Sequence, residues 1–195
     1  MKNKAKKDNI FYTQKGDNGD TSLFHCDQKR ISKSSIIIES LGSLDELNAF
    51  IGLTKLEKEI KDINFKKLKF DKILENIQQN LFIIQAEIGG SKMLIKKSEI
   101  NKIEKIINDI SLALPPVKSF IIAGGSLASA KLDYARTLAR KTERRVVALR
   151  DEKTRKVGNN TISYLNRLSS LLYALSRFAN FFYKNEEKVP HYGKK

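Results

Sequence analysis

The chain has 195 residues, of which 41% are hydrophobic and 30% charged, a balance that predicts one globular domain with a full-sized core. A single cysteine, Cys26, excludes an intrachain disulfide, favours a reducing compartment, and together with only two histidines disfavours structural zinc. No run of about 18 apolar residues exists, and residues 1–11 lack the apolar stretch of a secretory signal, so we expect a cytoplasmic protein with no membrane-spanning segment.

Apolar periodicity predicts five helices after an N-terminal segment without helical period. Ser43-x-x-Glu46 is typical of a capping box and places the start of the first helix near Ser43. The expected helices run over about 43–60, 71–88, 98–114, 126–149 and 161–183. The sequence therefore predicts an all-α helix bundle over residues 41–184. Residues 1–40 form an N-terminal segment of the same domain, and residues 185–195 form a flexible tail.

The N-terminal segment contains a glycine-rich turn with hydroxyl and ammonium donors. Gly16 and Gly19 stand three residues apart and let backbone N–H groups turn toward an anion, while Thr13, Lys15 and Thr21 add side-chain donors. An ordinary surface turn explains the same residues, so this motif alone leaves both interpretations open.

A second motif, 41–48, contains Asp45 and Glu46 at the start of the first expected helix. Carboxylates there are favoured by the helix dipole whatever the function, so good capping explains both. Capping does not explain Asn48, a mediocre helix former in the second turn.

A third motif lies on the fourth expected helix, where Arg136, Arg140 and Arg144 recur at i, i+4 and i+8. At roughly 100° per residue these three side chains fall within about 80° of one face, which Glu143 shares. Arginine presents a rigid, always-charged fork that suits phosphate and carboxylate oxygens, so the face predicts an anion site. Local ion pairs among Arg136, Arg140 and Glu143 remain an alternative.

A fourth motif interrupts the apolar stripe of the last helix with Asn166 and Arg167. This polar pair either caps the helix or faces a cleft, and the sequence does not distinguish the two.

Together and in this order, the four motifs resemble the ATP:cob(I)alamin adenosyltransferases of the trimeric, propanediol-utilisation (PduO) type, over about 12–182. The resemblance implies a five-helix up-and-down bundle, ferritin-like and of the cobalamin adenosyltransferase type, whose active sites lie at the subunit interfaces of a homotrimer. It also implies the reaction, in which the 5′-deoxyadenosyl group of ATP passes to the cobalt of reduced cobalamin, giving adenosylcobalamin and inorganic triphosphate.

The resemblance also implies roles for individual residues. The N-terminal loop would hold the triphosphate with Mg²⁺, often with K⁺ as well, through Thr13, Lys15, Gly16, Asp17, Gly19 and Thr21. Arg140, Glu143 and Asn166 match positions that hold ATP and its metal, with Glu143 as the metal ligand.

Three further residues match the catalytic region of the family. Arg136 matches a residue that pairs across the subunit interface with the acid matching Asp45, and Phe120 matches an aromatic that closes the lower face of the corrin ring. The expected partners are ATP and cob(I)alamin, with a flavin reductase and an adenosylcobalamin-dependent enzyme as further candidates.

The sequence departs from the usual family pattern at Gln14, Ala123, Asp133, Lys141 and Ser170. Lysine, proline, histidine, arginine and aspartate, respectively, are frequent at these positions. Asp133 and Ser170 leave open a change in corrinoid preference or affinity.

Two rival functions follow from other features. The formal net charge of +15 and the cluster from Arg140 to Arg145 would suit a nucleic-acid-binding module. No aromatic residues are interleaved with that cluster, which disfavours nucleic acid. A corrinoid carrier would keep the fold without turnover, but it would have no need of an ATP site.

Overall fold

The computed structural model describes residues 11–23 and 30–192. The predictions that concern Cys26, residues 1–10 and residues 193–195 lie outside the described residues. The elements in chain order are β1 (Asp20–Ser22), β2 (Arg30–Ser32), α1 (Ile36–Lys55), α2 (Lys58–Asp62), β3 (Asn64–Phe65), β4 (Leu68–Lys69), α3 (Phe70–Ile88), α4 (Lys97–Ala113), α5 (Leu127–Asp151) and α6 (Asn159–Phe182).

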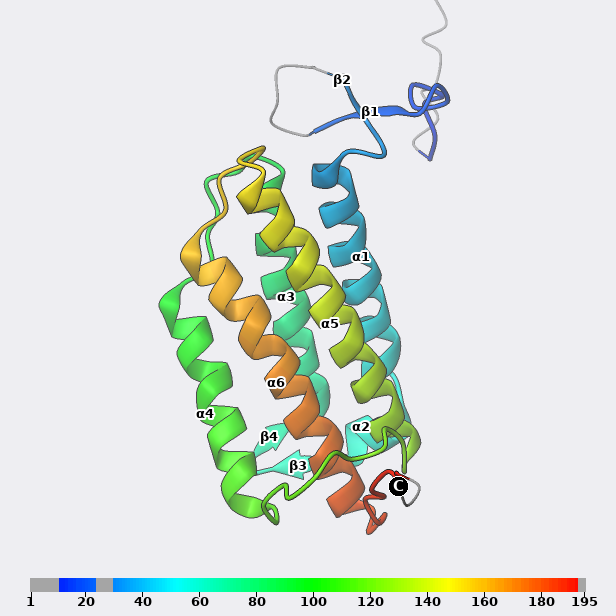
Figure 1. Cartoon of the computed structure of the whole chain (residues 1–195), viewed down its shortest axis with the longest axis vertical. Helices are drawn as coiled ribbons and strands as arrows, with labels where there is room; N and C mark the ends of the chain where they lie inside the picture. The colour runs from blue at the N-terminus through cyan, green and yellow to red at the C-terminus, as the bar shows by residue number, and fades with distance from the viewer. Residues whose placement is uncertain (1–10, 24–29, 193–195) are drawn as a thin grey trace, which may run out of the picture.

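Five long helices of the described chain, α1, α3, α4, α5 and α6, stand side by side and alternate in direction (Figure 1). Helix α5 packs against α6 and α1, while α4 packs on α6 and α3 on α1. The core is filled by the leucine and isoleucine stripes that define the helical period, such as Leu47, Ile77 and Leu168, all fully buried. The predicted all-α, five-helix up-and-down bundle is confirmed.

Helix α1 begins at Ile36, so the predicted capping box at Ser43 is wrong. Ser43 lies inside the helix and is buried against α5, where its carbonyl oxygen accepts a hydrogen bond of 2.9 Å from Thr142 Oγ1. Ile37 is also buried, and this packing draws two additional turns into the helix that the local capping signal does not predict. Asp45 and Glu46 consequently lie in the middle of α1.

Two short hairpins lie among the elements that the sequence analysis did not predict. Strands β3 and β4 pair antiparallel between α2 and α3, joined by Lys66 and Lys67, which both have positive φ (46° and 69°). Two-residue hairpin turns favour this conformation, but Asn and Gly are its usual residues, so the lysines give no sequence signal. At the N-terminus β1 pairs antiparallel with β2.

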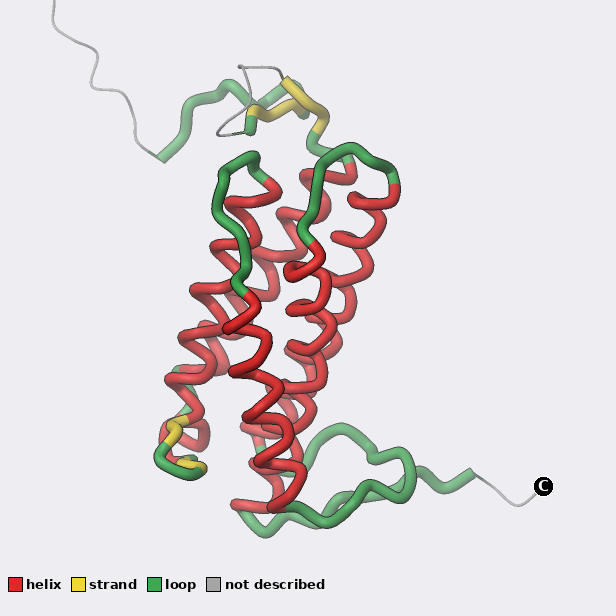
Figure 2. Tube along the Cα trace, turned by 90° about the vertical axis from the view of Figure 1, so that its left-hand side faces the viewer, coloured by secondary structure: helices red, strands yellow, loops and turns green. Residues whose placement is uncertain are grey.

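The segment from residue 114 to 126 crosses one end of the bundle together with the C-terminal tail (Figure 2). Arg177 of α6 donates from Nε and Nη2 to the carboxylate of Glu187, both at 2.8 Å, and Ile122 N donates to the Lys188 carbonyl at 2.8 Å. The tail that the sequence predicts to be loose therefore makes defined contacts with both α6 and this segment.

Helix α6 receives its N-terminal cap from another helix. Glu87 of α3 is 5% exposed, and its carboxylate accepts hydrogen bonds from Gly158 N (2.7 Å) and from Thr161 Oγ1. The N-cap residue Gly158 has no side chain to do this, so the buried carboxylate satisfies the helix end and complements its dipole.

We expect Glu87→Ala to lower the free energy of unfolding by about 1–3 kcal/mol, because buried donors lose a charged acceptor. The measurement is chemical denaturation followed by circular dichroism. Glu75→Ala is the matched control, since Glu75 lies on the same helix and pairs with the exposed Lys72 at 2.7 Å. Equal stability of the Glu87→Ala protein and the wild type would contradict this capping role.

Candidate active site

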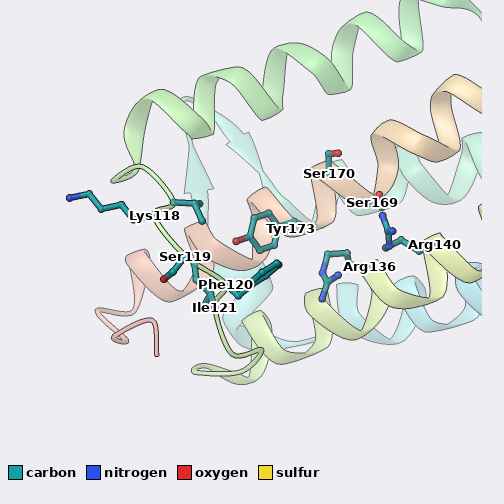
Figure 3. Close-up of a pocket in the computed structure, with 10 residues that line it drawn as sticks. Lys118, Ser119, Phe120, Ile121, Arg136, Arg140, Ser169, Ser170 and Tyr173 are labelled. Carbon is teal, nitrogen blue, oxygen red and sulfur yellow. The ribbon is translucent and has the colours of Figure 1, made fainter. Parts of the chain in front are cut away.

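The arginine face predicted from the sequence runs along two adjoining hollows between α5 and α6. The lower hollow, of about 640 Å³, is lined by residues 117–121 together with Arg136, Arg140, Ser169, Ser170 and Tyr173 (Figure 3). The upper hollow, of about 410 Å³, is lined by Arg140, Arg144, Glu143 and Asn166, among others. Arg140 lines both hollows, so it stands where they meet.

Phe120 projects from the segment that precedes α5 and is 82% exposed. This segment turns closely over α6 at Gly124 and Gly125, whose φ angles of +130° and +107° suit glycine. The amide of Asn180 holds the turn, accepting from Ser126 N (3.0 Å) and donating to the Gly124 carbonyl (2.9 Å). The turn is therefore well held although Ala123 replaces the proline that is usual in the family.

Arg136 has a partner within its own chain. Its Nε donates to Asp133 Oδ1 at 3.0 Å, and its guanidinium carbon lies 6.0 Å from the centroid of the Tyr173 ring. Burial raises the pKa of Tyr173 above its usual value, so the phenol stays protonated at neutral pH. The resemblance assigned Arg136 to Asp45 of a neighbouring subunit, but Asp45 is exposed on α1 and lines neither hollow.

Arg140 and Arg144 make no hydrogen bond or ion pair within residues 11–23 and 30–192. The cations beside them on α5 are paired, since Lys141 donates to Glu46 of α1 at 2.7 Å and Arg145 lies 3.5 Å from Glu39. Of the three guanidiniums that line the hollows, Arg136 is paired with Asp133, whereas Arg140 and Arg144 have no carboxylate partner in the described residues. Unneutralised, accessible guanidiniums in a concave site attract phosphate oxygens.

Glu143 does not pair with Arg140, which removes that part of the ion-pair alternative. Its Oε1 accepts a hydrogen bond of 2.9 Å from Asn166 Nδ2, and Arg167 donates to Asn166 Oδ1 at 2.8 Å and to Glu104 at 2.9 Å. Asn166 therefore faces the upper hollow rather than capping α6. Of the two interpretations that the sequence left open for this polar pair, the cleft holds for Asn166, whereas Arg167 lines neither hollow and pairs with Glu104 of α4.

The N-terminal loop lies beyond the end of the bundle where α1 begins, above the start of that helix (Figures 1 and 2). The segment 114–126, which carries Phe120, lies at the other end. Lys33 Nζ donates to the Gly16 carbonyl at 2.7 Å, and Arg30 Nη2 donates to the Asp20 carbonyl at 2.7 Å and to the Lys15 carbonyl. No hydrogen bond from residues 13–21 reaches α5 or α6 in the described part of the chain. Sequence reasoning missed Arg30 and Lys33, whose only signal is two cations shortly after a glycine-rich turn.

The six residues predicted to bind the triphosphate all lie in this loop, away from the arginine face: Thr13, Lys15, Gly16, Asp17, Gly19 and Thr21. Gly19 has a φ of +85°, which only glycine adopts without strain, so the tight turn depends on it.

Comparison with known proteins shows the family to which the chain belongs. The cobalamin adenosyltransferase family model matches residues 11–179. The chain belongs to the cobalamin adenosyltransferase family.

Curated relatives of this family include the corrinoid adenosyltransferases PduO of Citrobacter freundii (39% identical) and Salmonella typhimurium (40% identical), each aligned over 85% of this chain. The alignments cover 48% of those relatives, so the chain spans about half their length. The corrinoid adenosyltransferase of Bacillus subtilis is 35% identical over 87% of this chain and 86% of its own.

Solved structures similar to this family member include variants of the Lactobacillus reuteri PduO-type ATP:corrinoid adenosyltransferase. One, complexed with cobalamin and ATP, aligns with a TM-score of 0.81 at 26% identity, over 93% of this chain and 99% of that chain. Another, complexed with ATP, aligns with a TM-score of 0.79 at 28% identity, over 92% and 99%.

We expect Gly125→Ala to destabilise the segment that carries Phe120. A Cβ there would lie 2.2 Å from Asn180 Oδ1 and would force positive φ on alanine, which lowers the free energy of unfolding by about 1–3 kcal/mol. The matched control is Gly42→Ala on α1, where a Cβ meets nothing within 4 Å and helix propensity favours alanine. Thermal unfolding of both variants measures the difference, and equal melting temperatures would contradict the expectation.

Proposed function

We propose that the protein transfers the 5′-deoxyadenosyl group of ATP to the cobalt of cob(I)alamin, giving adenosylcobalamin and inorganic triphosphate. The observation that carries the proposal is the juxtaposition of the unpaired Arg140 with the hollow beneath Phe120. Family membership supports it, as do the relatives named as corrinoid adenosyltransferases and the similar structures that contain ATP and cobalamin.

ATP is assigned to the upper hollow. Its phosphates would meet the guanidinium of Arg140, which has no carboxylate to compete with them, while Asn166 and Glu143 line the same space. Arginine suits this role because its donors are fixed in one plane and its charge is permanent.

The corrinoid is assigned to the lower hollow, with Phe120 against its lower face. An aromatic side chain that is 82% exposed costs free energy unless something covers it, and a flat corrin ring is a suitable partner. By excluding a lower axial ligand, Phe120 would make reduction of cobalt(II) to cobalt(I) easier, and Tyr173 extends the same wall.

The reaction needs positioning rather than a general base. Cobalt(I) attacks C5′, so a cobalt–carbon bond forms while the bond between C5′ and the triphosphate oxygen breaks, and that oxygen keeps the electron pair. The protein must hold C5′ in line with cobalt and stabilise the negative charge on the departing triphosphate. Arg140 and Lys15 are the residues to which we assign that stabilisation.

A magnesium ion bound with ATP fits the donors of the upper hollow. Mg²⁺ is commonly held by one or two carboxylates plus substrate phosphates, and Glu143 offers a carboxylate whose Oε2 makes no hydrogen bond within the described residues. When bound, the ion would neutralise phosphate charge; K⁺ at the N-terminal loop is a further part of the proposal.

A homotrimer with active sites between subunits would bring the separated parts together. Within one chain the N-terminal loop and Asp45 lie away from both hollows, so a neighbouring chain would have to supply them. Leu53, Leu127 and Tyr134, on α1 and α5, are each more than half exposed, which suits a subunit contact.

The location and the other partners remain predictions. No helix of the described residues is long and apolar enough to cross a membrane. The single cysteine favours a cytoplasmic location, and a flavin reductase and an adenosylcobalamin-dependent enzyme are further candidate partners.

Arg140→Ala tests the function and its site together. In an anaerobic assay with chemically reduced cobalamin, ATP and Mg²⁺, the wild type should form adenosylcobalamin and triphosphate in equal amounts. The variant should lose turnover on the order of 100-fold to 1,000-fold, because the leaving charge loses its donor. Arg150→Ala is the control, since Arg150 lies on the same helix and pairs with Asp151 at 2.9 Å. A wild type without conversion overturns the function, and a fully active Arg140→Ala overturns the site.

Phe120→Ala tests the corrinoid assignment. The variant should bind ATP normally and should lose adenosylation when cobalt must be reduced from cobalt(II), because water can then occupy the lower axial position. With cobalt(I) supplied chemically the loss should be much smaller. Phe82→Ala, which removes an exposed aromatic from α3, is the control. Equal rates from cobalt(II) for Phe120→Ala and the wild type would contradict the assignment.

A further inference from the structure

The segment that carries Phe120 forms a wall between two hollows. Residues 117–121 line the lower hollow, and most of them also line a second one of about 370 Å³, which we call the rear hollow. Phe120 faces the lower hollow (Figure 3). The far side of the rear hollow is formed by Arg177, Glu187 and Val189. The wall is one chain thick there, so its position depends on the contacts that hold it from behind.

The C-terminal tail is attached to this wall through the backbone. Ile122 N, two residues after Phe120, donates to the Lys188 carbonyl at 2.8 Å. The wall and the tail cross the same end of the bundle (Figure 2). A chain terminus is poorly ordered unless it is tied down, so this hydrogen bond positions the wall only if the tail itself is fixed.

Arg177 of α6 fixes the tail and the start of the wall at once. Its Nε and Nη2 donate to the two carboxylate oxygens of Glu187, both at 2.8 Å, and Nη2 also donates to the Pro115 carbonyl at 3.1 Å. The Arg177 side chain is 12% exposed, and a paired guanidinium fork and carboxylate have a specific geometry. With the bond between Ile122 and Lys188, these contacts close a ring that joins α6, the tail and the wall.

We propose that Arg177 and Glu187 are positioning residues, which hold the tail against the wall so that Phe120 keeps its place against the lower face of a bound corrinoid. The inference rests on the proposed function for the identity of the ligand. Neither residue is placed in contact with the corrinoid, so their effect on the reaction passes through Phe120.

The position of Phe120 has to be held because its proposed role is to exclude a ligand. A ring that moved with the wall into the rear hollow would leave space for water at the lower axial position of cobalt. Asn180 holds one end of the wall, at Gly124 and Ser126. The pair of Arg177 and Glu187 supplies the corresponding hold on the part that carries Phe120.

Glu187→Ala is the first test, because it removes the acceptor of both Arg177 donors. Adenosylation that starts from cob(II)alamin, with reduced flavin as the electron donor, should fall about tenfold to 100-fold, since a small displacement of Phe120 admits the axial water. With cobalt(I) supplied chemically the rate should change by less than about twofold. Glu186→Ala is the matched control, since Glu186 is the adjacent tail carboxylate, is exposed, and makes no hydrogen bond or ion pair within the described residues.

Two measurements separate positioning from a general loss of structure. The electron paramagnetic resonance spectrum of cob(II)alamin bound with ATP reports the axial ligands of cobalt, and Glu187→Ala should show a larger five-coordinate fraction than the wild type. In a Phe120→Ala background, Glu187→Ala should cost less than about a further twofold, because the residue through which it acts is gone.

Hydrogen exchange tests the contact itself without any ligand. Peptides that cover residues 115–122 should exchange faster in Glu187→Ala than in Glu186→Ala. Glu187 lies beyond the end of α6, so the circular dichroism of the bundle should be unchanged. Arg177→Gln breaks the same contacts from the side of α6 and should reproduce both the faster exchange and the selective loss from cobalt(II).

Unchanged hydrogen exchange in Glu187→Ala would overturn the inference, as would a wild-type rate from cobalt(II), an equal loss from cobalt(I), or a full further loss in the Phe120→Ala background. A wild type that forms no adenosylcobalamin from cobalt(I) would instead overturn the proposed function. Hydrogen exchange would then still decide whether Arg177 and Glu187 hold the wall.

Discussion

The packing of α5 on α6 is the interaction on which the rest of the structure depends. The polar groups in this contact are matched across it, as in the pair of Ser129 and Ser176. Both hollows lie along the contact, and α6 also anchors the segment that carries Phe120. A change that shifted one helix against the other would move every proposed ligand contact of the bundle at once.

Helix α5 separates its paired cations from its unpaired ones by direction. Lys141 and Arg145 point toward α1 and are neutralised by its glutamates, whereas Arg140 and Arg144 face the hollows and have no partner in the described part of the chain. Exposed ion pairs add little stability, so the protein gains little from pairing the first two and loses little by leaving the others free. The stability that permits this comes instead from the leucine core and from buried contacts such as the Glu87 cap.

The helical period predicted α3, α4, α5 and α6 to within about two residues, because each has a strong apolar stripe and clear end signals. The start of α1 was missed because buried packing of Ile37 outweighs the local capping pattern at Ser43. The arginine face followed from spacing alone, since a period of 3.6 residues places i, i+4 and i+8 together. The bonds of Asn166 and Asp133 could not be foreseen in the same way, because their partners Glu143 and Ser176 lie on the facing helix.

The position of the charges, more than their number, separates the proposed function from nucleic-acid binding. A formal net charge of +15 would suit a polyanion, but the basic cluster around Arg140 is divided between paired residues on one flank and free guanidiniums in a concave site. A duplex needs a basic surface that follows its phosphates over several turns, whereas one triphosphate needs a few fixed donors in a small space. The upper hollow, of about 410 Å³, matches the second requirement, and it adjoins the lower hollow that Phe120 and Tyr173 line.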